Sequence, residues 1–443
     1  ELVDNPRDDG NISDFSQELR LSNASTPGAQ LRWTIGANYN RSKVSEYQDI
    51  TYGHNSLSNA GTNFIHISGV DNRGKMTNWA VFANAEYDVT DQITLKGAIR
   101  YTDSSNKNSM CNFDPGADQN VSELFQLLGN LLGGEDVPLA FGDCYTLNAD
   151  NLPGTVFNNN LKENNVSWKA GIDFKVSPET LLYANVSRGY KAGSFPVITA
   201  SLQSQLLPAK QESVTSYEAG FKTKLAGNAI QWSGAVFYQD YRDKQIQGTV
   251  ATGLFGLLQR LDNVPKSRIL GVETDIVIRP VEGLTLTGSA SYLDTKVQKY
   301  SGTSVFGVPT NFAGNRLPFA PEWTLVGDLD YRLPTANGGA FFMGGAVSYR
   351  TSVDAYVGGS KLAIPDNGVN RWSRSIPFKI DGYALVDARL GYDFPGDRVT
   401  ASVWGKNIFN KYHVQNVISY NDIITQSTGM PSTYGVSLKV RWK

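Results

Sequence analysis

The side chains of this chain that are best suited to chemistry are its three histidines, His54, His66 and His413. His54 and His66 lie in one long polar segment, where a metal ion or a haem group could use them, because imidazole is a common metal ligand. Histidines in exposed loops are more often bystanders. We therefore expect no metal site and no cofactor. His413 follows an Asn-Lys-Tyr segment and is expected at a strand end.

Charged side chains also recur along segments that we interpret as strands, where they could resemble acid–base machinery. They are Lys96, Arg100, Glu218, Lys222, Glu273 and Asp275. The same residues would line a water-filled lumen as paired charges, and we favour this second explanation. The sequence contains no H-E-x-x-H, G-x-S-x-G, Walker or Cys-x-x-Cys motif, so it predicts no catalytic residue and no enzyme.

Aromatic and arginine side chains in the long polar segments are the best candidates for binding a ligand. Arginine beside tryptophan suits carboxylate or catecholate groups, through charge-assisted hydrogen bonds and cation–π contacts. Ordinary packing of loops is the alternative role for such residues. The expected ligand contacts are Tyr52, His54, Phe64, Tyr356, Arg371, Trp372, Arg374 and Tyr420.

The two cysteines, Cys111 and Cys144, lie in residues 106–163, which we expect to form a long extracellular loop. An exported protein folds in an oxidising compartment, so we favour a disulfide over two free thiols. Closing a loop of roughly 34 residues would contribute ~3–4 kcal/mol in the chain-entropy description, less any strain.

Between the cysteines, apolar residues recur at helical spacing. Ser122 is the expected N-cap, and Gly133 with Gly134 the expected end. This short helix would be either a lid or partner-docking surface, or an apolar staple that packs the loop on itself. We favour the staple.

The elements that must position these residues are β-strands, because apolar and polar side chains alternate over segments of about ten residues. The alternation is clear in residues 31–39 (LRWTIGANY), 79–88, 166–175 and 434–442. One face of each such strand suits lipid and the other suits water. The pattern indicates a transmembrane β-barrel, although a soluble β-sandwich would alternate as well.

Aromatic side chains at both ends of the apolar face favour the barrel over the sandwich. They fall in pairs eight residues apart: Trp79 and Tyr87, Trp323 and Tyr331, and Tyr434 and Trp442. At about 3.3 Å per residue and a tilt near 40°, this spacing covers roughly 20 Å of the membrane normal, close to the apolar band between two aromatic girdles. We expect these six residues at the membrane interfaces.

Connections of very different length also favour the barrel. Short turns such as 91–92, 178–179, 227–228 and 395–397 alternate with long segments at 45–76, 106–163, 298–321, 354–378 and 411–432. Short periplasmic turns and long extracellular loops are typical of outer-membrane barrels. We count about fifteen strands. Since single-chain bacterial barrels have an even number, the odd count predicts that upstream strands are missing from this polypeptide.

Composition narrows the class further. The chain has 40 Lys and Arg against 42 Asp and Glu, a net charge of −2, which argues against a nucleic-acid partner. No run of about 20 apolar residues is present that could span as a helix. The chain opens with a polar run, residues 1–9, and not with a signal peptide. We therefore expect either mature numbering or a truncated chain.

Several segments, in order, resemble the barrel signatures of TonB-dependent outer-membrane receptors. The segments are 12–22 (ISDFSQELRLS), 187–195 (SRGYKAGSF), 208–212 (PAKQE) with 217–222 (YEAGFK), 267–273 (SRILGVE), 404–412 (WGKNIFNKY) and 431–438 (PSTYGVSL). The chain departs from the family at Ser432, where Arg is usual, and in ending with Trp442 and Lys443 instead of an aromatic residue. Family barrels have twenty-two strands, so this chain resembles roughly the last fifteen, and the plug domain and TonB box are absent.

The resemblance implies an all-β, antiparallel up-and-down barrel in the bacterial outer membrane, with residues 1–443 as one barrel domain that is incomplete at its N-terminus. It implies active import of a scarce nutrient, above all an iron–siderophore complex, bound by extracellular loops. The implied partners are outer-membrane lipid, the TonB complex acting through a plug, a small-molecule metal chelate and the barrel assembly machinery. The alternatives are a passive diffusion channel or other plug-free barrel and, more distantly, a secreted β-rich binding protein. The ligand and the oligomeric state are left open.

Overall fold

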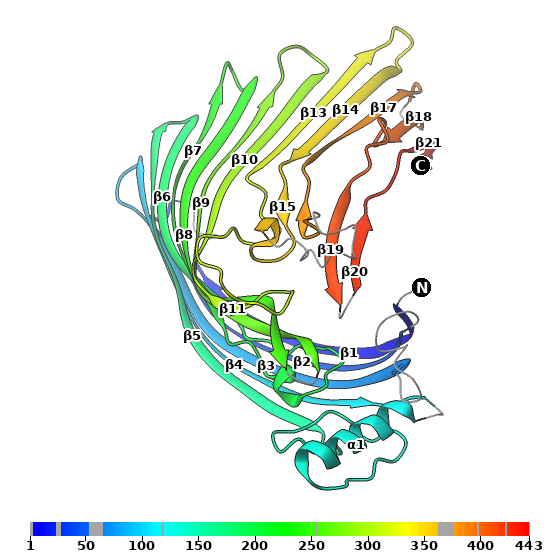
Figure 1. Ribbon diagram of the computed structural model, residues 1–443. Coiled ribbons are helices and arrows are strands. Elements are labelled where there is room, and N and C mark those ends of the chain that lie inside the picture. Colours follow the sequence, from blue (N-terminus) through cyan, green and yellow to red (C-terminus); the bar gives the residue numbers. More distant parts are fainter. Residues whose placement is uncertain are drawn as a thin grey trace.

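The computed structural model describes the chain apart from residues 1–2, 24–27, 53–64, 117–118, 253–254, 362–375, 397, 421–422 and 443. One strongly curved antiparallel sheet dominates it (Figure 1). The short turns gather at one end of the strands. The helix and the small hairpins gather at the other end and on the concave side, and both termini lie at the open side of the sheet.

Fifteen strands in the described part of the chain form the wall of this sheet. They are β1 (Val3–Ser22), β2 (Leu31–Tyr52), β3 (Ile67–Asp88), β4 (Ile93–Phe113), β5 (Phe157–Ser177), β6 (Thr180–Lys191), β7 (Glu212–Leu225), β8 (Ile230–Thr252), β9 (Gly256–Ile278), β10 (Leu284–Lys299), β13 (Trp323–Pro334), β14 (Ala340–Arg350), β17 (Tyr383–Asp393), β18 (Val399–Lys406) and β21 (Thr433–Val440). Each wall strand pairs with the wall strand before it in an antiparallel ladder. This up-and-down order confirms the predicted fold class. Among the described residues, β1 pairs only with β2 and β21 only with β18, which leaves the sheet open.

The remaining elements belong to the long connections. They are α1 (Asn120–Gly133), η3 (Gln203–Leu206), β11 (Ser301–Thr303), β12 (Pro309–Asn311), β15 (Val353–Asp354), η4 (Gly359–Lys361), β16 (Lys379–Ile380), β19 (Val414–Tyr420) and β20 (Ile423–Thr428). Three antiparallel pairs form among them, β11 with β12, β15 with β16 and β19 with β20. None of the described helices is long and apolar enough to cross a membrane.

The strands near the N-terminus run well past the limits that alternation suggested. Residues 45–52 belong to β2, 67–76 to β3, 106–113 to β4 and 157–163 to β5. The prediction that residues 106–163 form one loop was therefore wrong at both ends, and the connection itself spans 114–156. The polar residues of these extensions still pair in register across β2 to β5, because main-chain hydrogen bonding continues where apolar patterning stops.

The two faces of the wall differ as period-two alternation requires. Near the loop end, the even-numbered residues Val70 and Met110 face the concave side, where the connection between β6 and β7 packs on them. The odd-numbered residues Trp79 and Ile99 are exposed on the convex face. The apolar alternation thus supplies an outer surface suited to lipid, and the polar positions face the lumen.

Candidate functional site

The mouth of the sheet at the loop end is the candidate site, because the connection between β6 and β7 folds back into it. Ala200 and Leu206 of this connection are buried against Val70, Met110 and Phe157 of the wall. Burial of these apolar side chains stabilises the connection against the inner face of the wall, which is otherwise mostly polar. The mouth is therefore partly filled by the chain itself.

Tyr52, one of the expected ligand contacts, lies beside this packing. Its side chain is 5% exposed, and its hydroxyl lies 2.9 Å from the Ser68 hydroxyl and donates to the Thr199 hydroxyl at 3.3 Å. A cavity of about 220 Å³ adjoins these groups and is also lined by Phe125 and Leu258. The cavity therefore combines neutral hydroxyl groups with apolar walls.

Gln205 organises the turn that forms one wall of this cavity. Its Oε1 accepts hydrogen bonds from the backbone N–H groups of Ser201 (2.8 Å) and Leu202 (3.0 Å). Its Nε2 donates to the carbonyl of Gln259 at 3.1 Å, which ties η3 to β9. The sequence analysis missed Gln205, because a glutamine in a polar segment carries no signal until the fold brings β9 beside it.

Tyr356, the second expected contact within the described residues, joins two other connections. Its hydroxyl accepts the backbone N–H of Ser419 at 3.1 Å, and its ring meets that of Phe378 edge-on at 5.1 Å. Burial raises the pKa of the Tyr356 hydroxyl. The side chain thus links the segment around β15 to β19, and its hydroxyl already has a partner.

The other expected contacts are not placed. His54, Phe64, Arg371, Trp372 and Arg374 lie outside the described residues, and Tyr420 is described only as part of the backbone of β19. These residues stay predictions.

His413, expected at a strand end, directly precedes β19. It is buried, with Nδ1 3.1 Å from the Lys411 carbonyl and its ring 4.4 Å from that of Tyr383. Within the described ranges, no group of three or more His, Cys, Asp and Glu side chains could hold a metal ion.

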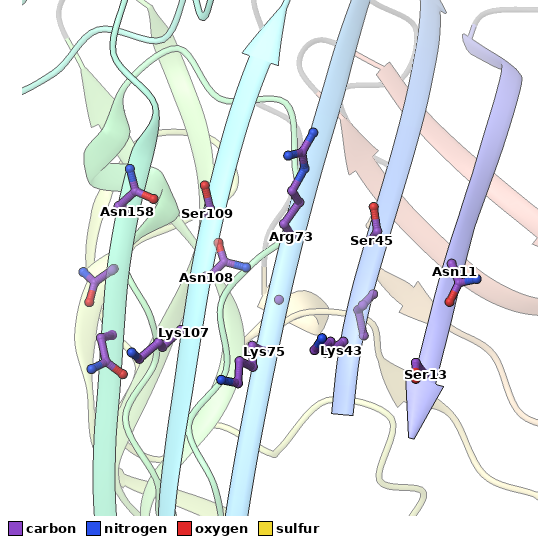
Figure 2. A pocket seen from close by; sticks show the side chains of 14 residues that line it. Asn11, Ser13, Lys43, Ser45, Arg73, Lys75, Lys107, Asn108, Ser109 and Asn158 are labelled. Atoms are coloured by element: carbon purple, nitrogen blue, oxygen red, sulfur yellow. The ribbon is translucent and has the colours of Figure 1, made fainter. Parts of the chain in front are cut away.

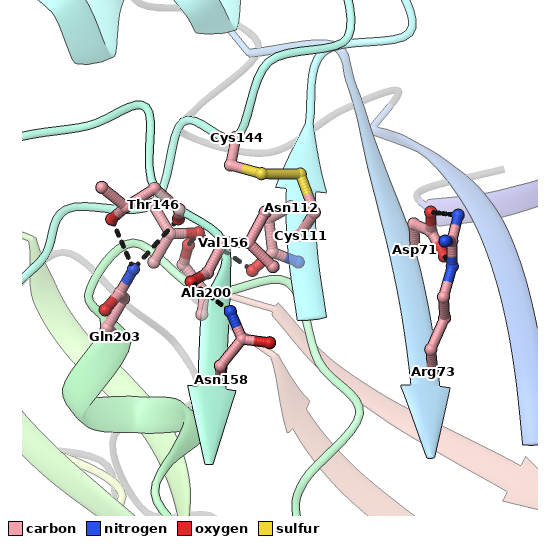
Figure 3. Close-up of a disulfide and its surroundings, with 11 residues drawn as sticks. Asp71, Arg73, Cys111, Asn112, Cys144, Thr146, Val156, Asn158, Ala200 and Gln203 are labelled. Atoms are coloured by element: carbon pink, nitrogen blue, oxygen red, sulfur yellow. Dashed lines mark hydrogen bonds and ion pairs between the residues drawn. A yellow bond between two sulfur atoms is a disulfide. The ribbon is translucent and has the colours of Figure 1, made fainter. Parts of the chain in front are cut away.

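The connection between β4 and β5 contains the disulfide and the helix. Cys111 at the end of β4 is bonded to Cys144 (Figure 3). Beside the bridge, the Thr146 hydroxyl contacts Asn112 Oδ1 at 3.0 Å and the Ala200 carbonyl at 2.9 Å. The connection is thereby tied both to the wall and to the segment that fills the mouth.

Helix α1 begins three residues earlier than predicted, with Gln119 and not Ser122 at the N-cap position. The carboxylate of Asp114, which is 0% exposed, accepts the backbone N–H groups of Val121 (2.9 Å), Ser122 (3.0 Å) and Gly116 (2.8 Å). The negative charge of this carboxylate also stabilises the helix, because it lies at the positive end of the helix dipole. The predicted end is correct: Gly134 closes α1 in the left-handed conformation, at φ 75°.

The helix packs mainly on its own connection. Val121 and Phe125 are buried with Leu139, Tyr145 and Leu147, and Phe255, which lies between β8 and β9, stacks on Phe125 with ring centroids 6.0 Å apart. Leu131, on the far edge of the helix, is exposed. The packing links two connections on the rim of the mouth.

The lumen charges of the wall are largely paired or hydrogen-bonded. Lys96 forms an ion pair with Asp173 at 2.5 Å, and Arg100 donates to Asn38 Oδ1 at 3.0 Å. Ser289 donates to Asp275 at 2.5 Å. These contacts form a hydrogen-bonded network on the inner face. Lys222 and Asp275 also line one open cavity of about 430 Å³ at the turn end of β7 and β9.

The six residues expected at the membrane interfaces lie on the wall strands or directly after them. Trp79, Tyr87, Trp323, Tyr434 and Trp442 are exposed, and Tyr331 is half-buried. We call the aromatic residues nearer the loop end the upper row. Contacts between strands extend this row, since the ring of Trp79 lies 5.3 Å from that of Tyr101 and the ring of Tyr39 lies 6.3 Å from that of Phe15. The arrangement has the form of two exposed aromatic rows, and their position at the lipid boundary stays a prediction.

Comparison with known proteins places this geometry in context. The family model described as TonB dependent receptor-like, beta-barrel, matches residues 3–408. The structure is similar to the ferric yersiniabactin uptake receptor FyuA from Yersinia pestis, with a TM-score of 0.69 at 16% identity over 98% of this chain and 54% of that one. It is also similar to the siderophore receptor PiuA from Acinetobacter baumannii (TM-score 0.68, 14% identity, 97% and 56% covered) and to the ferric-catecholate import receptor Fiu from E. coli K12 (0.60, 14%, 97% and 55%). The chain spans about half the length of each of these proteins.

Proposed function

This chain belongs to the TonB-dependent receptor β-barrel family and lies in the bacterial outer membrane, and on this premise we propose that it forms the wall and mouth of a receptor that imports a ferric chelate. The family and the similar structures are receptors and transporters. The solved relatives are named for ferric yersiniabactin, siderophore and ferric-catecholate uptake, and we extend that ligand class to this chain.

The observation that carries the proposal is the folded-in connection between β6 and β7. A passive channel needs an open lumen, whereas here Ala200 and Leu206 are buried in the mouth and a small cavity lies beside Tyr52. Pockets that combine apolar walls with a few fixed polar groups are typical of ligand sites. A mouth built in this way suits selective binding better than unselective flow.

The proposed binding step uses one group at the cavity wall and three residues that the sequence predicts as ligand contacts. Tyr52 supplies a hydroxyl at the cavity wall, and Arg371, Trp372 and Arg374 would add positive charge and an aromatic face toward an anionic chelate. Transport through the lumen would use energy delivered by the TonB complex acting on a plug.

The test is binding to the native full-length receptor, purified from the outer membrane in detergent. Ferric catecholate and ferric citrate would be titrated while tryptophan fluorescence is followed, with the iron-free chelators as controls. We expect saturable binding of at least one ferric chelate, and about fivefold weaker binding in the Tyr52→Phe variant, which loses one hydrogen-bonding hydroxyl. Tyr87→Phe, at the far end of the wall, is the matched control and should bind like the wild type.

Two results would count against the proposal. The first is the absence of saturable binding for both chelates together with steady ion conductance in a planar lipid bilayer, which would favour the passive channel. The second is equal binding of the ferric and iron-free forms, which would remove the metal chelate as the ligand class.

A further inference from the structure

Three lysines stand directly side by side on neighbouring strands near the loop end of the wall. Register pairs Lys43 of β2 with Lys75 of β3, and Lys75 with Lys107 of β4. Figure 2 shows the three side chains at one level across these strands. The row continues in uncharged residues, Ser13 on β1 and Asn160 on β5.

The lysine row lies on the convex face of the wall. Lys75 and Lys107 are odd-numbered, whereas Val70 and Met110 of the same strands face the concave side under the β6–β7 connection. Successive strand residues alternate between faces, so the lysines point away from the lumen. All three lysine side chains are exposed.

The row stands just beyond the upper aromatic row on the same face. Tyr39 and Trp79 are paired in register, and Lys43 and Lys75 each lie four residues farther toward the loops. Four residues correspond to about 13 Å along a strand and about 10 Å along the membrane normal at a tilt near 40°. Lysine stems can extend back toward the lipid, which brings the ammonium groups to the depth of the lipid headgroups.

The three ammonium groups have no carboxylate partner within the described residues. Like charges directly opposite each other on adjacent strands are only about 5 Å apart at Cβ and destabilise the sheet. Arg73, two residues above Lys75, is by contrast paired with Asp71 at 2.8 Å. A row of unpaired like charges is therefore a cost that an anion at this level would remove.

Strands β9 and β10 provide a comparison at the corresponding level of the wall. Lys296 of β10 also lies four residues beyond an aromatic residue, Tyr292, which contacts Trp323 at 4.9 Å. Its register partner is Arg268, whose guanidinium is paired with Asp294 at 2.8 Å. Arg268 is thus paired with a carboxylate. Lys266 and Lys299 also lie opposite each other on β9 and β10, but only β2 to β4 set three lysines side by side among the described strands.

The surface around the lysine row is shaped to hold a polar group. A shallow groove of about 780 Å³ follows the row, and Asn11, Ser13, Asn158 and Asn160 add neutral polar groups at its two ends. Tyr39 and Trp79 lie four residues from the lysines on the same face. Positive charge above an apolar, aromatic surface matches a lipid with an anionic headgroup and acyl chains.

We propose that Lys43, Lys75 and Lys107 form a binding site for the phosphate-bearing headgroup of an anionic lipid of the outer leaflet. The phosphate lies on the lysine row, and the acyl chains lie along the exposed apolar face below Tyr39 and Trp79. The site is on the outside of the barrel and is separate from the nutrient-binding mouth. It would orient the receptor in the membrane and lower the repulsion within the lysine row.

Native mass spectrometry of the full-length receptor in detergent micelles tests this proposal. The probes are phosphatidic acid, which carries a phosphate monoester, and zwitterionic phosphatidylcholine with the same acyl chains. Each lysine near an anionic lipid surface contributes roughly fivefold to binding, so the triple Lys→Gln variant should retain phosphatidic acid about a hundredfold more weakly. Lys296→Gln is the matched control and should bind like the wild type. Lys75→Gln alone, which alters one side chain, should show a smaller loss in the same direction if the triple variant fails to fold.

A competition arm separates a lipid site from a simple phosphate site. Inorganic phosphate in large excess should leave the bound phosphatidic acid in place, because the acyl chains contribute to binding. Displacement by inorganic phosphate would replace the lipid proposal with a free-anion site. Equal retention of the two lipids, or an equal loss in the Lys296→Gln control, would overturn the assignment to the lysine row.

Discussion

Asp114 is the residue whose replacement tests the architecture of the mouth most directly. Its buried carboxylate accepts three backbone N–H groups, two of them in the first turn of α1. Replacing Asp114 with Ala leaves these donors without a partner in a buried position. Loss of a helix cap costs about 0.5–2 kcal/mol, and an unsatisfied buried donor costs about 1–3 kcal/mol. We therefore expect the connection 114–156 to lose about 3 kcal/mol of local stability.

Hydrogen exchange followed by mass spectrometry measures this loss. A change of 3 kcal/mol corresponds to roughly a hundredfold increase in the open population, so the amides of α1 should exchange about a hundredfold faster in the Asp114→Ala variant. Asp114→Asn keeps the shape and one acceptor oxygen, and we expect about tenfold faster exchange. Amides in the membrane-spanning part of β4 should not change.

Two outcomes would refute this reasoning. Unchanged exchange in α1 for both variants would mean that the carboxylate does not hold the helix. Equally faster exchange throughout the wall would mean that Asp114 supports the whole barrel, and then the connection would not open as a separate unit.

Three further predictions concern other parts of the described structure. Reduction of the Cys111–Cys144 bridge should make the connection 114–156 more sensitive to protease while the barrel stays folded. The reason is that closing this loop contributes ~3–4 kcal/mol to stability. Unchanged cleavage with and without reductant would argue against a stabilising role. Burial and the nearby carboxylate of Asp262 raise the pKa of Tyr300 above its usual range, and the Tyr300 hydroxyl donates to Asp262 at 3.2 Å. The stability that the neutral form of Tyr300 contributes is therefore complete below about pH 10 and is lost as the pH rises further. The free energy of unfolding, measured above pH 10, should fall less steeply with pH in Tyr300→Phe than in the wild type. Parallel curves for the two proteins would contradict this assignment. Tyr52→Phe should also loosen the β6–β7 connection by about 1 kcal/mol, seen as several-fold faster exchange of its amides, and no change would show that the hydroxyl contacts are not stabilising.

Several features of the protein follow from local sequence patterns. Alternation of apolar and polar side chains predicts the strands and the two faces of the wall, because the period of two is a property of each strand by itself. Gly134 predicts the end of α1, since a residue at φ 75° favours glycine. The ordered receptor-like motifs predicted the family, which the match over residues 3–408 confirms.

Other features needed the tertiary structure, because they depend on residues distant in sequence. Strands β2 to β5 extend beyond the apolar pattern through cross-strand hydrogen bonds, which a single segment does not reveal. Tyr52 is fixed by Thr199 across nearly 150 residues, and α1 is capped by Asp114 and not by the nearer Ser122.

The lysine row shows the same division most clearly. Lys43, Lys75 and Lys107 are each isolated in the sequence, spaced 32 residues apart, and no local pattern connects them. Strand register alone sets them side by side. Sequence by itself thus determined the strands, their two faces and the family. Pairing between strands and packing of the connections decided which side chains meet, because those contacts depend on distance in space and not on distance along the chain.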